Sequence, residues 1–494
     1  MPNFSIVHKQ DIFITEKYEP DIRRDEQSFL SRSFERHFNE RPYLHHTCYL
    51  FLTKTTRERS RQQSNWNTLC RGFLVPKEIR DKETVERFME AVGQFESIVN
   101  DSGLVKLERL TTEEITGTES EPGIIERYLT LSADGSRMLQ DMQLNPDEMR
   151  IGDKRLCLHT LSDLDDLPGK VRTDGRYERL STDRSDCRLS HAAPVGVMLP
   201  CDHIYNQWIF IDDSNENLSR FEKAAKNMQS LSRYSRSNQI NKEWLDEYLN
   251  EAHSNGLQSI RCHCNVIAWA ENGEELRRVK NDVGSALALM ECTPHHNTTD
   301  LPAVYWAGIP GNEADFPSEE TFYTFTGQAL CFFTAETCYR NSLSPFGIRM
   351  VDRLTGKPVF LDISDLPMKK GVVTNRNKFI LGPSGSGKSF FTNHLVRQYW
   401  EQGTHILLVD TGNSYKGLCD LIHQKTGGDD GIYFTYKEDD PISFNPFFTE
   451  NYQYDIEKRD SIKTLILTLW KREDEPPRRS EEVALSNAVS LYIE

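Results

Sequence analysis

An octapeptide near the end of the chain constrains its fold more than any other feature. Residues 382–389 read Gly-Pro-Ser-Gly-Ser-Gly-Lys-Ser and fit the pattern G-x-x-x-x-G-K-[ST], whose glycines let the backbone curl until its N–H groups point at bound phosphates. The apolar run at residues 379–381 ends directly at this loop and predicts a buried strand. Phe391, Leu395 and Tyr399 recur every four residues after the loop and predict a helix with one packed face. Strand, loop and helix in this order predict a nucleotide-binding α/β unit.

The residue types of the loop predict its contacts with a nucleotide. Lys388 reaches the β- and γ-phosphate oxygens, where its charge acts on the transferred phosphoryl group, and the Ser389 hydroxyl is a ligand for Mg²⁺. ATP and Mg²⁺ are therefore the expected cofactors, with Lys388 as a catalytic residue and Ser389 as the metal ligand. The residues predicted to bind the nucleotide are Gly382, Pro383, Ser384, Gly385, Ser386, Gly387, Lys388, Ser389 and Phe390. The competing interpretation, a glycine-rich turn without a ligand, gives no reason for a lysine at this position.

A second apolar run, at residues 405–409, ends in Asp410. It is connected to the first predicted strand through the intervening helix, which predicts a second parallel strand of the same sheet. Ligands bind at the C-terminal edge of such sheets, so Asp410 is predicted to be catalytic, holding a water on Mg²⁺ or polarising the attacking water. A carboxylate that closes a turn or caps the next helix is an equally weighted alternative.

The last part of the chain predicts an α/β P-loop NTPase domain over residues 370–494. A helix is expected at 417–425, a third strand at 433–436, and an exposed, charged linker at 470–482 between two helices. An acidic strand that would complete the Mg²⁺ site does not follow residue 411, so the sheet is expected to be incomplete.

The chain before this domain alternates strands and helices in an α+β pattern. A hairpin around Thr355-Gly356 is predicted to lead into the nucleotide domain. Other predicted strands and helices lie at residues 49–53, 85–99, 217–252 (with a break at 232–241), 259–269 and 276–290. The predicted domains are an α+β docking or assembly domain at 1–340, with an internal break near 110–215, a connector hairpin at 341–369, and the nucleotide domain at 370–494.

Composition limits the classes of function that remain. A chain of 494 residues is too long for one core, so two to four domains are expected. The formal charge of −16 is a poor overall field for binding a nucleic-acid backbone. No apolar run has the length of a bilayer span, and the first residues lack the apolar core of a signal peptide. We therefore expect a cytoplasmic protein that reaches a membrane only through partners.

The eleven cysteines include no C-x-x-C pair, which favours reduced thiols. A zinc site is one interpretation of the cluster Cys262, Cys264, Cys292, His295 and His296. The alternative is a strand at 259–269, in which Cys262 and Cys264 share one face, pack as small apolar residues, and leave His263 on the other face. This explains the cysteines at least as well as zinc does.

Three further segments accompany the phosphate loop in a fixed order. Ile309-Pro-Gly-Asn312 precedes it, and Val409-Asp-Thr-Gly-Asn-Ser414-Tyr415 and Ile442-Ser-Phe-Asn445-Pro-Phe447 follow it. With the loop, they resemble the cytoplasmic ATPases of type IV secretion and conjugation machines, most closely the TraG-type ATPases of Bacteroides-group conjugative transposons. The ordered combination is more specific than the phosphate loop, which many enzymes share.

The resemblance implies a RecA/HerA-like motor domain with a parallel sheet, assembled into a homo-hexamer. It also implies a place at the cytoplasmic side of the inner membrane, held there by other secretion components. ATP hydrolysis would power pilus or channel assembly, or DNA transfer. Two alternatives stay open: a nucleotide-regulated docking scaffold, and a DNA-pumping coupling ATPase whose contact with DNA is indirect here.

The family's acidic strand and arginine finger are expected beyond residue 494. We therefore expect a C-terminally truncated molecule that is an ATPase by family but has little activity alone. Within the landmarks, Ser414 and Tyr415 are explicable as a cap and a packing aromatic, and Asn445 as a residue that stabilises a loop.

Overall fold

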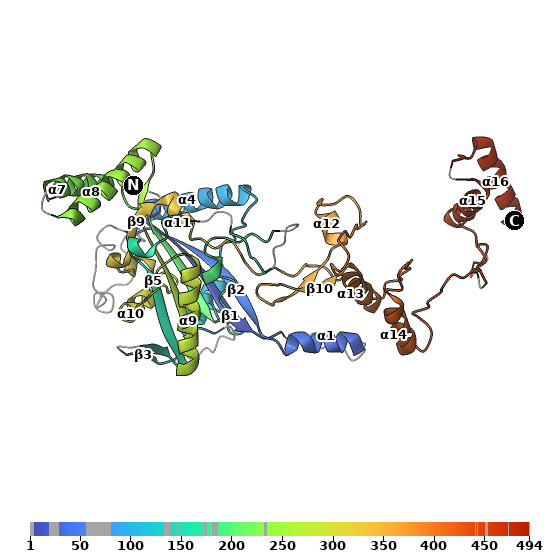
Figure 1. Ribbon diagram of the computed structural model, residues 1–494, viewed down its shortest axis with the longest axis horizontal. Helices are drawn as coiled ribbons and strands as arrows, with labels where there is room; N and C mark the ends of the chain where they lie inside the picture. The colour runs from blue at the N-terminus through green and yellow to red at the C-terminus, as the bar shows by residue number, and fades with distance from the viewer. Residues whose placement is uncertain are drawn as a thin grey trace. The chain divides into compact units, whose positions relative to one another are not determined.

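The chain divides into two compact units, Met1–Phe379 and Ile380–Glu494 (Figure 1). The computed structural model describes residues 4–18, 29–55, 81–132, 140–145, 148–171, 175–179, 186–231, 235–439, 441, 443–449, 453–472 and 474–493. Each unit is described by itself below.

A nine-stranded antiparallel sheet forms the centre of the first unit. Its main strand order is β2-β1-β6-β7-β5-β4-β3, with β8 paired to β5 and β9 paired to β7. The strands are β1 (Ile6–Glu16), β2 (Tyr43–Thr53), β3 (Met142–Leu144), β4 (Met149–Ile151), β5 (Lys154–Leu161), β6 (His203–Phe210), β7 (Ser259–Ala270), β8 (His295–His296) and β9 (Phe322–Phe325). The strands predicted at 49–53 and 259–269 are confirmed within β2 and β7.

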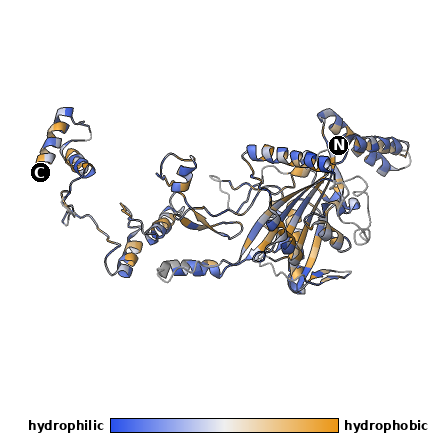
Figure 2. Cartoon of the chain, turned by 180° about the vertical axis from the view of Figure 1, so that it is seen from behind, coloured by the Kyte–Doolittle hydropathy of each residue, from blue (hydrophilic) through white to orange (hydrophobic). Residues whose placement is uncertain are grey.

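The sheet is covered on both faces. All eight residues of β6 are buried, because one face packs under α9 (Gly273–Leu289) and the other under α10 (Leu301–Ala307). The hydropathy colours of Figure 2 gather hydrophobic residues on the strands. Fully burying one large apolar side chain contributes about 1.5–3 kcal/mol, so these two layers are the main source of stability in this unit.

The structure of β7 shows how Cys262 and Cys264 pack. Cys262 and Cys264 are buried in the same cluster as Val279 of α9. His263 faces the other layer, where its ring lies 4.7 Å from that of Phe316. The predicted alternation along this strand is confirmed.

The helical patterns of the first unit are confirmed, with sharper ends than predicted. The helix expected at 85–99 is α4, and the one at 276–290 is α9. The predicted break at 232–241 is too long, because α8 already begins after Ser235, whose backbone is extended. The α-helices before α9 are α1 (Phe29–Asn39), α4 (Lys82–Asp101), α5 (Thr112–Thr116), α6 (Ile124–Thr130), α7 (Ser214–Leu231) and α8 (Arg236–Asn255). The 3₁₀ turns in the described residues are η2 (Leu164–Asp166), η3 (Ala193–Val195), η4 (Glu313–Asp315) and η5 (Ser318–Glu320).

The connector hairpin is also confirmed. After α11 (Thr326–Leu330), β10 (Ile348–Val351) pairs antiparallel with β11 (Pro358–Leu361), and α12 (Asp365–Lys369) follows. The turn between the strands is tied to the edge of the large sheet, since the Leu44 amide donates to the Thr355 carbonyl at 3.1 Å.

The second unit is helical in its described residues. Its helices are α13 (Lys388–Glu401), α14 (Lys416–Thr426), α15 (Ile456–Trp470) and α16 (Arg479–Ile493). The helices expected after the phosphate loop, at 417–425, and on both sides of the linker are therefore present. No described residue between 380 and 493 belongs to a β-strand.

The predicted strands at 379–381, 405–410 and 433–436 are thus not formed. A strand is stable only with a neighbour to complete its backbone hydrogen bonds, and a parallel sheet also needs both faces covered. Here Leu407 and Val409 are each 93% exposed, so nothing in this unit covers the second segment. The α/β pattern of the sequence appears as helices joined by unpaired extended segments.

Candidate nucleotide-binding site

The loop before α13 is curled in the way its glycines permit. Gly385 and Gly387 have φ angles of +78° and +88°, a region that other residues rarely adopt. A Cβ atom at Gly382 would lie 2.4 Å from Ser386 Oγ, so the loop folds back on itself there. No heavy atom lies within 4 Å of the Cβ positions of Gly385 and Gly387, which leaves open space on that side of the loop.

Lys388 lies over this loop. Its ammonium group donates to the carbonyl oxygens of Gly382 at 2.7 Å and Pro383 at 2.8 Å. Hydrogen bonds from an ammonium to phosphate oxygens are stronger than those to neutral carbonyls, so a phosphate can take these contacts over. The lysine predicted to be catalytic therefore lies against the glycine loop, and its contact with a phosphate stays a prediction.

The residues after Lys388 form the first turn of α13. Its free backbone N–H groups and helix dipole favour an anion at this end. Ser389 lies in this turn, and Phe390 is exposed and makes no core contact. Curled glycines, the lysine and a helix N-terminus are the donor set that a nucleoside triphosphate requires, and the Ser389 hydroxyl fits Mg²⁺.

Asp410 closes a turn before α14. One carboxylate oxygen accepts from the Gly412 amide at 2.9 Å, and the other accepts from the Tyr415 amide at 3.2 Å. The turn interpretation of Asp410 is therefore observed. Each carboxylate oxygen keeps a further lone pair, so the contacts do not prevent a role toward Mg²⁺.

Asn393 connects this turn to the phosphate-loop helix. Its side-chain amide donates to the Ser389 carbonyl at 2.9 Å and to the Ser414 carbonyl at 3.1 Å. Sequence reasoning missed this residue. The available signal was its spacing, since a residue four positions after Ser389 lies on the same side of a helix.

Comparison with known proteins identifies this region. Residues 347–494 match the family model described as "TraG P-loop domain". This part of the chain is similar to TraG P-loop domains. The predicted resemblance to TraG-type conjugative ATPases is confirmed at that level, and the assignment to Bacteroides-group transposons stays a prediction.

A curated relative agrees with the assignment. The chain is 30% identical to Protein TraC of Escherichia coli (strain K12) over 107 residues, which are 22% of this chain and 11% of that protein. The matched stretch is thus about a ninth of that relative's length.

The other landmarks of the matched region are structural in this conformation. The Tyr433 hydroxyl donates to Asn413 Oδ1 at 2.6 Å, which ties the 433–436 segment to the Asp410 turn. The Asn445 side chain accepts from the Phe447 amide at 3.0 Å and closes a local turn. Asn445 therefore stabilises a loop, as the sequence indicated, whereas Ile442 lies outside the described residues.

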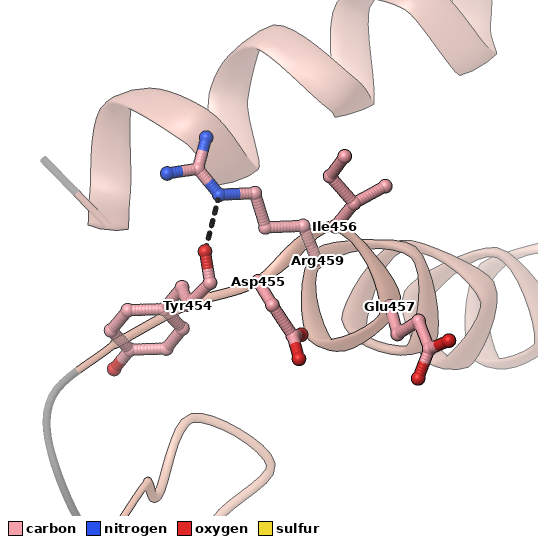
Figure 3. A pocket seen from close by; sticks show the side chains of 5 residues that line it. All are labelled: Tyr454, Asp455, Ile456, Glu457 and Arg459. Atoms are coloured by element: carbon pink, nitrogen blue, oxygen red, sulfur yellow. Dashed lines mark hydrogen bonds between the residues drawn. The ribbon is translucent and has the colours of Figure 1, made fainter.

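A surface hollow of the matched region lies at the start of α15 (Figure 3). It is lined by Tyr454, Asp455, Ile456, Glu457 and Arg459. Asp455 caps α15 by accepting from the Lys458 amide at 2.7 Å, and Arg459 Nε donates to the Tyr454 carbonyl at 3.3 Å. The lining residues come from a single helix start, and Asp455 and Arg459 are engaged in local hydrogen bonds, so we assign no ligand to this hollow.

The residues of the possible zinc site have different structural roles. Cys262, Cys264 and Cys292 are core residues of the first unit, and burial raises the pKa of the Cys292 thiol to about 12. His295 is exposed and lies 2.7 Å from an Asp166 oxygen. Among the residues that the structure describes, no group of three or more His, Cys, Asp or Glu side chains is arranged to hold a metal.

Proposed function

We propose that the chain is the ATP-binding and ATP-hydrolysing motor of a conjugative type IV secretion system. The observation that carries the proposal is the curled loop with the Lys388 ammonium over it, at the start of α13, in a region similar to TraG P-loop domains. By this proposal, ATP turnover drives pilus or channel assembly, or DNA transfer.

Within the proposed site, the chain's own groups bind and orient the nucleotide. The loop amides and Lys388 would hold the phosphate oxygens, the Ser389 hydroxyl would hold Mg²⁺, and Asp410 would orient a water at that ion. Bound Mg²⁺ neutralises charge on the phosphates. Lys388 leaves the carbonyls of Gly382 and Pro383 when phosphate oxygens become available.

We further propose that the exposed segments become strands in a larger assembly. Leu381 is 84% exposed, and the 405–410 run carries two residues exposed to 93%. Apolar surface of this kind is favourable only when covered. A homo-hexamer with a RecA/HerA-like parallel sheet in each subunit would supply the cover, in the cytoplasm and at the inner membrane through partners. Among the described helices, none combines the length and hydropathy of a membrane span.

Replacing Lys388 by Ala tests the motor function. The affinity for ATP should fall roughly 10–100-fold, as for a lost charge-assisted contact, and turnover and conjugative transfer should be lost together. Equilibrium titration with fluorescent ATP and a mating assay measure the two effects. Lys370→Ala, which changes an exposed lysine directly after α12, is the matched control.

The outcomes separate the alternatives. If transfer survives in the Lys388→Ala protein, the motor proposal is wrong and a nucleotide-regulated docking scaffold, built on residues 1–340, takes its place. Turnover that rises on addition of DNA favours a DNA-pumping coupling ATPase.

A further inference from the structure

We propose that Asn393 is a positioning residue that couples Asp410 to the Mg²⁺ held at Ser389. The inference rests on the proposed function, because it assigns Asn393 a role at the same nucleotide site. It adds a residue that neither the loop motif nor the family landmarks include.

The geometry is a bridge made by one side chain. Asn393 lies one helical turn after Ser389 in α13, and its amide group has two N–H hydrogens. One is donated to the Ser389 carbonyl at 2.9 Å and the other to the Ser414 carbonyl at 3.1 Å. The side chain therefore holds the residue of the expected metal ligand and the Asp410 turn together.

The second half of the bridge runs through the turn itself. Ser414 precedes Tyr415, whose amide donates to the Asp410 carboxylate at 3.2 Å, and the Gly412 amide fixes the other oxygen at 2.9 Å. A displacement of α13 on nucleotide binding is thus passed to the carboxylate through two backbone contacts. None of these hydrogen bonds joins Asp410 directly to α13. The position of Asp410 relative to Ser389 therefore depends on the side chain of Asn393.

The residue type supports the same conclusion. Asn is a weak helix former, several tenths of a kcal/mol worse than Ala, and it lies here in the interior of a helix. An amide is the smallest side chain with two donors for two carbonyl oxygens. Aspartate has the same shape but no donor at neutral pH, and alanine and leucine have none.

The test is a comparison of ATP affinity with and without Mg²⁺, measured by titration calorimetry on the full chain. Asn393→Ala, which favours the helix, should change the Mg²⁺-free affinity less than twofold. It should reduce the gain in affinity on adding Mg²⁺ by roughly 2–10-fold, as expected for one hydrogen bond. Asp410→Asn should reduce the gain similarly, and the double variant should lose no more than the worse single variant.

Two more variants complete the design. Asn393→Leu keeps the size of the side chain without donors and should behave as Asn393→Ala does. Thr392→Val is the matched control, because the Thr392 hydroxyl donates only to the Lys388 carbonyl within the same helix, at 2.9 Å. It should leave the Mg²⁺-dependent gain unchanged.

Each contrary outcome has a distinct meaning. If the wild-type chain binds ATP in neither condition, the proposed function fails. If ATP binds but Asn393→Ala weakens binding equally with and without Mg²⁺, Asn393 only supports the helix and the inference is overturned. Additive losses in the double variant would overturn it as well, since independent residues add.

Discussion

Three histidines of the sheet are buried and neutral in the folded protein. Burial lowers the pKa of His8 to about 3, of His203 to about 4 and of His263 to about 3. His8 and His263 each have one hydrogen-bond acceptor, the Asn206 side chain at 3.0 Å and the Glu320 carbonyl at 2.6 Å, which fits a neutral ring. The two carbonyls beside His203, from Cys201 and Val195, raise its pKa, but burial outweighs them. A proton can enter these rings only at a cost of burying charge.

We predict that the first unit loses stability as the pH falls below about 6.5. The pKa of a histidine is near 6.5 in the unfolded chain and lower in the fold, so the unfolded chain binds protons first. Each histidine then removes up to about 1.4 kcal/mol per pH unit until its folded pKa is reached. Urea unfolding at several pH values, followed by tryptophan fluorescence, measures the slope.

Two variants separate this effect from other titrations. His8→Gln should lower the slope, whereas His253→Gln should not, because the His253 side chain is 57% exposed. An unchanged slope in His8→Gln would contradict the assignment.

Asp11 is the most heavily hydrogen-bonded carboxylate of the sheet. Burial alone would raise its pKa, but the hydrogen bond from His46 and the charge of Lys9 outweigh burial and hold the pKa below its usual range. His46 Nε2 lies 3.0 Å from one oxygen, and Thr334 Oγ1 and Gln207 Nε2 each lie 2.8 Å from the other. Lys9 also bonds the carboxylate.

Asp11→Asn should therefore lower the free energy of unfolding by about 3–5 kcal/mol at pH 7, since it leaves a buried network without its charge. Asp246→Asn removes the carboxylate that pairs with Lys242 at the surface, 2.8 Å away. It should lower the free energy of unfolding by less than about 1 kcal/mol. Denaturant midpoints compare the two variants. Equal losses would show that the Asp11 network adds nothing beyond a surface pair.

At the scale of elements, the α7–α8 hairpin forms a small core together with Phe325 of β9. Leu249 is buried against Leu218, Ala225 and Ala252, whereas Leu231 at the end of α7 is 46% exposed. Leu249→Ala should cost about 2–4 kcal/mol and increase amide exchange throughout α7 and α8. Leu231→Ala should leave exchange unchanged; faster exchange there would mean that the end of α7 is part of the core.

Elements with an amphipathic pattern were predictable, and elements whose surroundings decide their form were not. The apolar stripes of α4 and α9 and the alternation in β7 each encode one buried side. β6 lacks the alternation that would reveal it, because Asn206 and Gln207 are buried in its middle, where their amide groups donate to side chains of neighbouring strands. Without the structure, these polar residues would suggest a loop.

The missing strands of the second unit show the opposite limit. The runs at 379–381 and 405–410 carry the composition of strands, yet they find no neighbour among residues 380–493. Composition predicts that a segment forms a strand when other strands and helices pack against it. Whether those neighbours are present is not encoded in the segment itself. The candidate site follows the same rule: the loop is local and was predicted, whereas the Asn393 bridge is a tertiary contact and was not.

At the scale of the whole molecule, the two units differ in how much apolar surface they bury. The three clusters of buried apolar residues all belong to the first unit. Among the described residues of the second unit, the buried apolar ones are Val396, Ile422, Ile462 and Val489. The second unit therefore relies mainly on local helix formation, which is marginal for helices of this length.

Hydrogen exchange on the full chain should show this difference. Amides of α13 to α16 should exchange through openings of a few kcal/mol, while those of β6 and β7 should exchange near the global free energy of unfolding. Mass spectrometry of pulse-labelled peptides resolves the two groups. Equal protection in both would mean that the second unit has a core that these contacts do not explain.

The order of strands in the sheet also determines when each strand can pair while the chain is being synthesised. β1 lies between β2 and β6, and its first residue, Ile6, pairs with Phe210. β1 and β2 can pair soon after both have left the ribosome. The other edge of β1 then stays unpaired, because its partner strand is synthesised much later. Contacts so distant along the chain form slowly, so the free edge of β1 stays exposed to other nascent chains until His203–Phe210 emerges.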